Sequence, residues 1–277
     1  MAERPPANKS YRNKPMTNIL ELDVIKQRID IPELIEAIEE GFVLYSDGKV
    51  VVPPVGFLSF EEPPGDVHIK YGYVKGDDVY VLKVASSFYD NHKLGIPFAD
   101  GVLLVFSQQT GHLQLVLHDQ CWLTDIRTAA AGAVAARHLA PKNVQGIGIV
   151  GTGTQARMQL ALLKGIVDCN RCVIWGRNPD KVAQMIDDLG SSDSIAAWGL
   201  EFEVAESIDV LTASCNLIVT TTPAREPLLY ADQILAGTHI TAMGSDDHGK
   251  QELEAALLGK ADLVVADSIA QCIDHGE

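Results

Sequence analysis

The sequence lacks a long apolar run and has few basic residues. It contains no stretch of about eighteen uncharged apolar residues, the length that a bilayer core requires of a spanning helix, so no membrane segment is expected. Lys and Arg number 22 against 37 Asp and Glu, which gives a net charge of −15. Because nucleic-acid binding needs clustered cations to neutralise phosphates, nucleic acid is not an expected partner.

The chain also has only five cysteines, an odd number, and most of them lie inside apolar segments. This usage is typical of reduced thiols in a cytoplasmic protein and does not indicate a disulfide framework. Cys169 and Cys172 form a CxxC, but no second Cys/His pair follows at ligand spacing, so we expect thiols at a helix-to-strand turn and no metal site. Residues 1–18 are polar, contain prolines and lack the apolar core of a signal peptide, which predicts a disordered leader.

Residues 19–125 predict a first, mixed α+β domain. Residues 19–45 begin as a short strand and continue with apolar residues at helical spacing. Residues 101–119 contain two apolar runs joined by "QTGH", which is typical of a hairpin. Further strand-like runs occupy residues 48–60, 68–74 and 78–89. We therefore expect a mixed, mainly antiparallel sheet flanked by helices.

Residues 126–277 predict a second domain of the Rossmann type. An Ala-rich helix at 123–140, with Thr124 or Asp125 as its cap, leads into a regular alternation of strands and helices. Such alternation with short connections predicts a doubly wound parallel sheet, so the fold class is α/β. The expected strands are "IGIVG", "RCVIWGR", "EFEVAES", "NLIVTTT", "HITAMG" as the fifth, and "ADLVVAD" at 261–267.

The strongest motif is "IGIVGTGTQARMQL" at residues 147–160. Gly151, Gly153 and Ala156 give G-x-G-x-x-A directly after a strand and at the start of a helix. The first glycine permits a tight turn, the second lets backbone approach a pyrophosphate, and the small third residue allows close packing of helix on strand. This pattern predicts a dinucleotide-binding site.

The end of the second strand bears on the choice between NAD and NADP. An acid there would bind the ribose diol of NAD, but the sequence has Arg177 and Asn178 instead. A guanidinium suits the 2′-phosphate of NADP, so we favour NADP; the alternative is an arginine that lies over the adenine without selecting a phosphate.

The local sequence does not explain why two cationic residues, Lys83 and Arg127, occupy their positions. Lys83 interrupts the apolar strand "VYVLKVASS", where it either faces solvent or lines a cleft. Arg127 lies in the first turn of the Ala-rich helix, where a cation is unfavourable for the helix dipole unless an anion is close.

Together the motifs "LTDIRTAAAGAVAARHLAPKN", "IGIVGTGTQARMQ", "NLIVTTTPAREPLL" and "MGSDDHGKQEL", in this order and spacing, resemble the ornithine cyclodeaminase/μ-crystallin family over roughly residues 19–277. The resemblance implies a homodimer, with residues 19–125 as substrate and dimerisation domain, and hydride chemistry at the α-carbon of an amino or imino acid. The family continues beyond the position of Glu277, so the Rossmann domain is expected to be incomplete at its C-terminal end.

The resemblance also implies roles for individual residues. Lys83 and Arg127 match the residues that hold the substrate carboxylate, and Asp246 matches the catalytic aspartate. The implied cofactor contacts are Arg127, Thr128, Gly151, Gly153, Thr154, Gln155, Ala156, Arg177, Asn178, Thr220, Thr222 and Lys250. Two positions depart from the family pattern: Val55 stands where an arginine is common, with Lys70 or His68 as possible substitutes, and His248 replaces a proline.

The expected activity is conversion of L-ornithine to L-proline and ammonia with an internally recycled nicotinamide. The alternatives are an NADPH-dependent ketimine or imino-acid reductase and a non-catalytic nucleotide-binding protein. Asp246 and Asp247 follow the fifth strand. We expect Asp246 to enter the ligand crevice as acid–base catalyst, while Asp247 either starts a helix at "GKQEL" or faces solvent.

Overall fold

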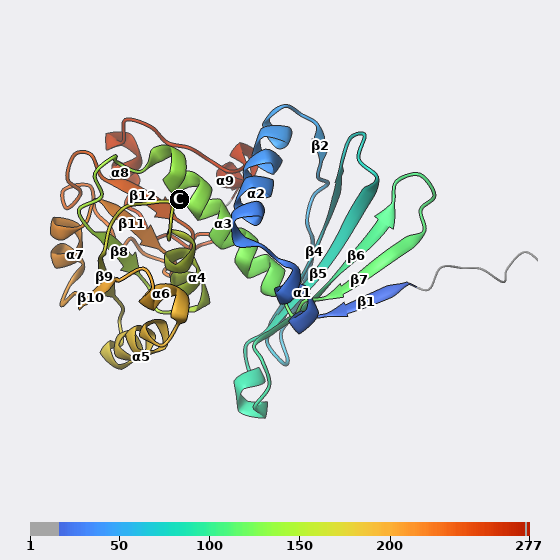
Figure 1. Ribbon diagram of the computed structural model, residues 1–277, viewed down its shortest axis with the longest axis horizontal. Helices are drawn as coiled ribbons and strands as arrows, with labels where there is room; N and C mark the ends of the chain where they lie inside the picture. Colours follow the sequence, from blue (N-terminus) through green and yellow to red (C-terminus); the bar gives the residue numbers. More distant parts are fainter. Residues whose placement is uncertain (1–16, 275) are drawn as a thin grey trace, which may run out of the picture. The chain divides into compact units, whose positions relative to one another are not determined.

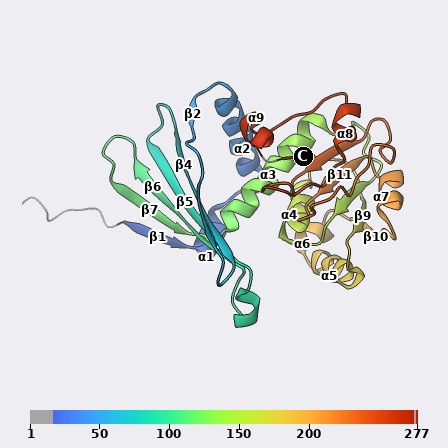
Figure 2. The ribbon, with the colours of Figure 1, turned by 180° about the vertical axis from the view of Figure 1, so that it is seen from behind.

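The computed structural model describes residues 17–274 and 276–277, and its contacts divide them into two compact units (Figures 1 and 2). Unit 1 comprises the described residues up to Ile29 together with Leu44–Leu123. Unit 2 comprises Asp30–Val43 and Thr124–Glu277. No helix in the described residues is long and apolar enough to cross a membrane.

Unit 1 is built on a seven-stranded sheet in the order β1-β7-β6-β5-β4-β2, with β3 also paired to β4. All neighbouring strands are antiparallel except β1 and β7, which confirms the expected mixed sheet. The predicted hairpin is β6 and β7. The elements are β1 (Asn18–Glu21), α1 (Leu22–Arg28), β2 (Val50–Val51), β3 (Gly56–Phe60), β4 (Gly65–Val74), β5 (Val79–Phe88), the short 3-10 helix η2 (Asn91–Leu94), β6 (Ala99–Ser107) and β7 (Leu113–His118).

The two faces of this sheet differ in character. Directly paired residues of antiparallel strands point to the same side, so the register assigns each side chain to a face. The apolar face carries mainly aliphatic and aromatic residues, including Ile69, Tyr71, Leu82, Val84 and Leu104. The polar face carries Asp66, His68 and Lys70 of β4 and Lys83 and Ser87 of β5.

Unit 2 contains a five-stranded, fully parallel sheet in the order β10-β9-β8-β11-β12. The reversal of strand order at β8 and β11 is the doubly wound pattern that the alternation predicts. Its strands are β8 (Ile147–Val150), β9 (Arg171–Trp175), β10 (Glu201–Val204), β11 (Leu217–Thr220) and β12 (His239–Ala242). Its helices are α4 (Thr154–Leu162), α5 (Pro179–Gly190), α6 (Asp193–Ala196), α7 (Ile208–Ser214), α8 (Ala255–Lys260) and α9 (Ile269–Asp274), with α2 (Ile31–Ser46) and α3 (Trp122–Leu139) shared between the units.

Buried aliphatic residues cover both faces of the parallel sheet. On one face Ile149 and Ile174 pack with Leu160 of α4 and Met185 of α5. On the other face the core includes Leu211 of α7 and Leu257 of α8, packed with strand residues such as Ile218. Strands covered on both sides in this way are expected to be almost entirely apolar, as β8 and β11 are.

Helix α2 contributes its first three turns to unit 2. The helix follows Asp30, whose carboxylate accepts a hydrogen bond from the N–H of Glu33 at 3.0 Å. Further along, the carboxylate of Glu39 accepts hydrogen bonds from Arg137 at 2.6 Å and from His138 at 2.7 Å, both at the end of α3. These contacts hold the pKa of Glu39 below its usual value, with the bond to His138 the larger cause.

Three local predictions are wrong. Residues 261–267 form no strand, because they pair with no neighbour and leave Leu263 with 66% of its surface exposed. No helix starts at "GKQEL", since α8 begins only at Ala255. Neither Thr124 nor Asp125 caps α3, which begins at Trp122, and the carboxylate of Asp119 instead accepts the N–H of Leu123 at 2.9 Å.

Candidate functional site

The chain turns sharply at Gly151, directly after β8. Gly151 has a φ of 125°, and a Cβ placed on it would lie 2.6 Å from the hydroxyl oxygen of Thr221. Its N–H donates to the carbonyl of Trp175 at the end of β9, at 2.9 Å. Both the backbone conformation and the close approach therefore require a glycine here.

Helix α4 begins one residue after Gly153, and its N-terminus is not capped by a side chain. Among the described residues, no atom lies within 4 Å of a Cβ built on Gly153, and the first turn of α4 contains no acid. Ala156 is fully buried in the core beneath β8. Open backbone N–H groups at the positive end of a helix dipole suit a phosphate, so the motif has the local geometry of a dinucleotide turn.

The side chains of Gln155 and Thr128 form hydrogen bonds within the protein. Gln155 donates through Nε2 to the carbonyl oxygen of Asp125 at 3.1 Å, and the hydroxyl of Thr128 donates to the carbonyl of Thr124 at 2.7 Å. A Cβ on Gly132 of α3 would lie 1.9 Å from Oε1 of Gln159, so α3 and α4 pack closely. Gln155 is thus placed to offer its backbone N–H, and not its amide side chain, to a ligand.

Arg177 and Asn178 follow β9 at the carboxyl edge of the sheet. The amide oxygen of Asn178 caps α5, accepting the N–H of Asp180 at 2.9 Å and that of Lys181 at 3.4 Å. Arg177 is exposed. The structure therefore gives Asn178 a helix-capping task that the sequence analysis did not assign to it.

The carboxylate of Glu252 joins the carboxyl ends of β11 and β12. Its two oxygens accept the hydroxyl of Thr220 at 2.6 Å, the hydroxyl of Thr222 at 2.7 Å and the N–H of Thr222 at 2.6 Å. They also accept the N–H of Gly244 at 2.8 Å. The hydroxyls of Thr220 and Thr222 thus donate to a buried carboxylate, although the resemblance had implied cofactor contacts for them.

Glu252 itself has no exposed surface. Burial raises the pKa of its carboxyl, and the hydrogen bonds from Thr220, Thr222 and Gly244 act in the opposite direction. The sequence analysis missed this residue because a glutamate in "GKQEL" has the pattern of an exposed residue. Its position just before the apolar Leu253 is the sole local sign of burial.

Asp246 and Asp247 lie in a turn after β12, and neither caps a helix. The carboxylate of Asp246 accepts a hydrogen bond from the ammonium of Lys250 at 2.5 Å. Asp247 accepts the N–H of His248 at 2.8 Å and leads into Gly249, whose φ is 73°. The helix-start role of Asp247 is therefore wrong, and its side chain is exposed, which is the other role expected for it. Asp246 follows the carboxyl end of β12, and its entry into a ligand crevice stays a prediction.

Arg127, near the start of α3, interacts electrostatically with carboxylates of unit 2. Desolvation lowers the pKa of its guanidinium, whereas Asp267, Asp125 and Asp246 act to raise it. The guanidinium remains charged at neutral pH, because its pKa starts far above this range. These acids offset the unfavourable interaction of Arg127 with the helix dipole. The effect of Asp246 on Arg127 shows that the two side chains are close enough to interact electrostatically.

Lys83 lies in the middle of β5 in unit 1, half-buried and on the polar face of its sheet. Because Arg127 belongs to unit 2, their convergence on one substrate carboxylate stays a prediction. Val55, which replaces a common arginine of the family pattern, is exposed just before β3.

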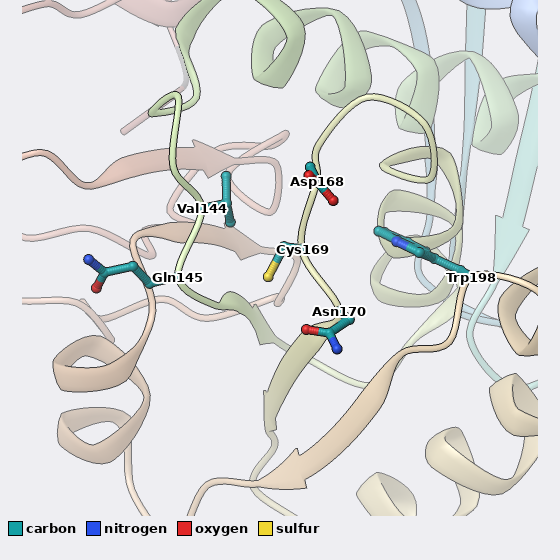
Figure 3. A pocket seen from close by; sticks show the side chains of 6 residues that line it. All are labelled: Val144, Gln145, Asp168, Cys169, Asn170 and Trp198. Atoms are coloured by element: carbon teal, nitrogen blue, oxygen red, sulfur yellow. The ribbon is translucent and has the colours of Figure 1, made fainter.

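A cavity of about 380 Å³ lies at the opposite edge of the parallel sheet (Figure 3). Its lining includes Gln145 before β8, Asn170 before β9 and Cys169 of the CxxC. Gly151 and Asp246 follow the carboxyl ends of their strands, so this cavity contains none of the expected site residues. Its position at the amino ends of the strands makes it a poor candidate for the nucleotide site.

Comparisons with known proteins identify the family of the chain. The model of the ornithine cyclodeaminase/mu-crystallin family matches residues 16–277. The chain belongs to this family. The uncharacterized cyclodeaminase y4tK of Sinorhizobium fredii is 35% identical over 265 residues, which cover 95% of this chain and 78% of that protein.

Two solved structures share the fold over more than nine tenths of this chain. An archaeal alanine dehydrogenase dimer with bound NAD superposes with a TM-score of 0.82 at 32% identity, over 92% of this chain and 76% of the other. The iminosuccinate reductase of Paracoccus denitrificans in complex with NAD⁺ gives a TM-score of 0.83 at 28% identity, over 93% and 77%. The fold is therefore that of nicotinamide-binding dehydrogenases and reductases of this family.

Proposed function

We propose that this protein is a nicotinamide-dependent enzyme that transfers hydride to or from the α-carbon of an α-amino or α-imino acid. The observation that carries the proposal is the common edge of the parallel sheet. The uncapped α4 follows β8 there, and Asp246 follows β12, with β11 between these strands. Ligands bind at this edge in doubly wound folds, so a titratable carboxylate lies where substrate would meet cofactor.

The residues at this edge of the sheet have separate roles in the proposed reaction. Gly151, Gly153, Thr154 and Ala156 shape the turn and offer backbone N–H groups to the pyrophosphate, and Lys250 adds a cation on the cofactor side. When bound, the nicotinamide supplies or accepts the hydride. The carboxylate of Glu252 accepts hydrogen bonds from Thr220, Thr222 and Gly244. These bonds fix the backbone just before the loop that contains Asp246.

On the substrate side, Arg127 and Lys83 hold the α-carboxylate. A guanidinium can bind it through two parallel hydrogen bonds, and an ammonium adds a point charge. Asp246 exchanges a proton with the substrate nitrogen and balances the positive charge of the protonated imine.

A second candidate is cyclisation of L-ornithine to L-proline with loss of ammonia. The name of the rhizobial relative y4tK favours a cyclodeaminase. The first half of that reaction uses the same residues, because the α-amine is oxidised to an imine before the side-chain amine attacks. The two candidates differ in whether the cofactor is consumed.

For the cofactor we propose NADP over NAD, with Arg177 on the 2′-phosphate. The support is that Gly176, Arg177 and Asn178 follow β9 without a carboxylate for the ribose diol. The alanine dehydrogenase and the iminosuccinate reductase hold NAD, so a direct comparison of both cofactors is needed.

We further propose that the protein acts as a homodimer through the apolar face of the unit 1 sheet. Large side chains are exposed on this face, including Leu58, Phe60, Tyr71 and Tyr73. An exposed apolar patch of this kind marks an interface, and the similar alanine dehydrogenase is a dimer. Leu58→Asp should shift the species seen by light scattering from dimer to monomer; an unchanged dimer would place the interface elsewhere.

The experiment that tests the function is a panel of amino and imino acids, followed at the nicotinamide absorbance with NAD and NADP and combined with proline detection. Net cofactor turnover with an α-imino acid supports the first candidate. Proline formation from ornithine without net cofactor consumption supports the second. Tight nucleotide binding without either reaction would leave a nucleotide-binding protein without turnover and reject both.

A further inference from the structure

Three polar side chains contact one another in a row on the unit 1 sheet. Asp66 lies on the polar face of β4, with 16% of its side chain exposed. One of its carboxylate oxygens accepts the hydroxyl of Tyr89, and the other lies 3.3 Å from Nδ1 of His68. A single carboxylate therefore contacts a phenol through one oxygen and an imidazole through the other.

The contact with Asp66 determines which nitrogen of His68 faces away from the carboxylate. Because Nδ1 lies beside Asp66, Nε2 lies on the other side of the ring. The ring of Phe57, which pairs with His68 across β3 and β4, packs against the imidazole with 5.0 Å between the ring centroids. Within the described residues Nε2 makes no hydrogen bond, and 38% of the His68 side chain is exposed. The imidazole is thus oriented by its neighbours and retains one nitrogen for a ligand or a water molecule.

His68 also lies close to Lys83, which holds the α-carboxylate of the substrate in the proposed function. The β4–β5 register pairs His68 with Ala85 and places Lys83 two residues earlier on β5, so His68 and Lys83 leave the same face. Diagonal neighbours of this kind are about 7–8 Å apart, within reach of a long side chain. Figure 1 shows β4 and β5 side by side. A ligand of amino-acid size at Lys83 therefore has the imidazole beside it.

A histidine that is oriented by a carboxylate is suited to general acid–base catalysis. Its outer nitrogen exchanges a proton with the reacting group, while the carboxylate holds the ring and stabilises the imidazolium that forms. In the proposed function Asp246 serves the substrate nitrogen. A second acid–base group on the substrate face is then available for a water molecule at the α-carbon.

We propose that His68 is a further catalytic residue, the general acid–base for the addition of water to the α-imino acid. This inference rests on the proposed function, in which hydride transfer from an α-amino acid forms that imine. The reaction then continues to a 2-oxo acid and ammonia. Asp66 and Tyr89 are positioning residues, because they act through the imidazole.

The step conserves atoms and electrons. The water oxygen bonds to the α-carbon, the electron pair of the C=N bond moves to nitrogen, and the water proton passes to Nε2 of His68. His68 returns this proton to the nitrogen, and the C–N bond breaks with release of ammonia. The hydroxyl becomes the carbonyl of the 2-oxo acid as its proton passes to His68 and then to solvent. All of the oxidation takes place in the preceding hydride transfer.

The test runs the reaction in the reductive direction with two kinds of substrate. A 2-oxo acid with ammonium (pyruvate, oxaloacetate or 2-oxopentanoate, whichever reacts fastest) forms an imine only by losing water, the reverse of the proposed step. Δ1-Pyrroline-2-carboxylate is already a cyclic imine. Consumption of the reduced nicotinamide is followed for the unchanged full chain, His68→Gln and His112→Gln. His112 is a matched control, because it is exposed and lies between β6 and β7. Thermal unfolding checks that each variant remains folded.

We expect His68→Gln to lower kcat with the 2-oxo acid and ammonium at least about 100-fold, the usual contribution of a general acid–base. The loss with the cyclic imine should be at least about tenfold smaller, since that reaction includes no water step. KM for the 2-oxo acid should change less than kcat, and His112→Gln should behave as the unchanged protein. In His68→Ala, added imidazole should restore part of the reaction with the 2-oxo acid, which a merely structural role would not allow.

Equal losses with the two kinds of substrate in His68→Gln would overturn the inference, because His68 would then hold the substrate or support the sheet. Unchanged kinetics in His68→Gln, or no recovery with imidazole in His68→Ala, would overturn it as well. If the unchanged protein reduces the cyclic imine but none of the 2-oxo acids with ammonium, the proposed function stands and the role of His68 is wrong. If it reduces neither, the hydride-transfer function itself fails, and the role of His68 fails with it.

Discussion

Asp246 and Lys250 form an ion pair of 2.5 Å across four residues, with the aspartate side chain 70% exposed and the lysine 24% exposed. Within the described part of the chain, the neighbouring Asp247 forms local contacts in its turn. The two adjacent carboxylates thus have different partners, and substitution can separate their roles.

Asp246→Asn should lower kcat at least about 100-fold, because a lost general acid–base contributes two to four orders of magnitude. Asp247→Asn should change kcat little. Both variants should unfold near the temperature of the unchanged protein, since both side chains are exposed. Steady-state kinetics on the two variants make the comparison, and equal effects would show that the assignment of Asp246 as catalyst is wrong.

Lys83→Met and Arg127→Met should each raise KM for the amino or imino acid by about ten- to a hundredfold, the value of one charge-assisted contact. Nucleotide affinity, measured by fluorescence titration, should stay close to that of the unchanged protein for Lys83→Met. Lys93→Met serves as control, because Lys93 lies in η2 outside the sheet and pairs with Asp90. An unchanged KM in both variants would mean that these cations do not hold the substrate.

Arg177→Ala should weaken the binding of NADP by about ten- to a hundredfold and the binding of NAD much less, because only NADP carries the 2′-phosphate. The ratio of the two dissociation constants is the decisive quantity. A preference of the unchanged protein for NAD, or equal losses for both cofactors, would reject the proposed phosphate contact and leave the arginine over the adenine.

The two glycines of the turn after β8 should behave differently. Gly153→Ala should leave the free energy of unfolding within about 0.5 kcal/mol and weaken nucleotide binding, because the space beside Gly153 is open and needed for close backbone approach. Gly151→Ala should destabilise the fold by about 1–3 kcal/mol, since φ is positive and Thr221 lies too close. Urea unfolding and nucleotide titration distinguish these outcomes; a destabilised Gly153→Ala would contradict the first.

His239, at the start of β12, should make stability depend on pH. Burial lowers its pKa from 6.5 to about 4, so the unfolded chain binds more protons than the folded protein between these values. Its contribution is complete above pH 6.5 and is lost as the pH falls toward 4, by at most about 1.4 kcal/mol per pH unit. His239→Gln should flatten this part of the stability profile, and an unchanged slope would show that His239 is not responsible.

The parallel sheet and its glycine turn could be predicted from the sequence because their signals are local. The strand before Gly151, the small Ala156 and the helix after them follow one another along the chain. The hairpin of β6 and β7 is equally local, with Gly111 at a φ of 68° in its turn. Pro179 at the start of α5 and the capping Asn178 set that helix start in the same way.

The remaining features depend on contacts between distant segments. Glu252 is a buried hydrogen-bond acceptor because Thr220 and Thr222, about thirty residues earlier in the chain, donate to it. The local sequence around Glu252 does not indicate these donors. The direct pairing of Lys70 in β4 with Lys83 in β5 follows from the strand register, which the periodicity of the sequence does not determine. Residues 261–267 have a strand-like pattern, but a strand forms only with a partner.

The placement of α2 has a consequence for dissecting the protein. A fragment that began at Thr124 would look complete by its strand–helix alternation, yet it would lack Asp30–Val43. Arg137 and His138 would lose the carboxylate of Glu39, and the surface that covers the buried Ile35 would face water. Unit 2 is thus formed by two separated segments of the chain, and expressing it alone calls for a linker that joins residue 43 to residue 124.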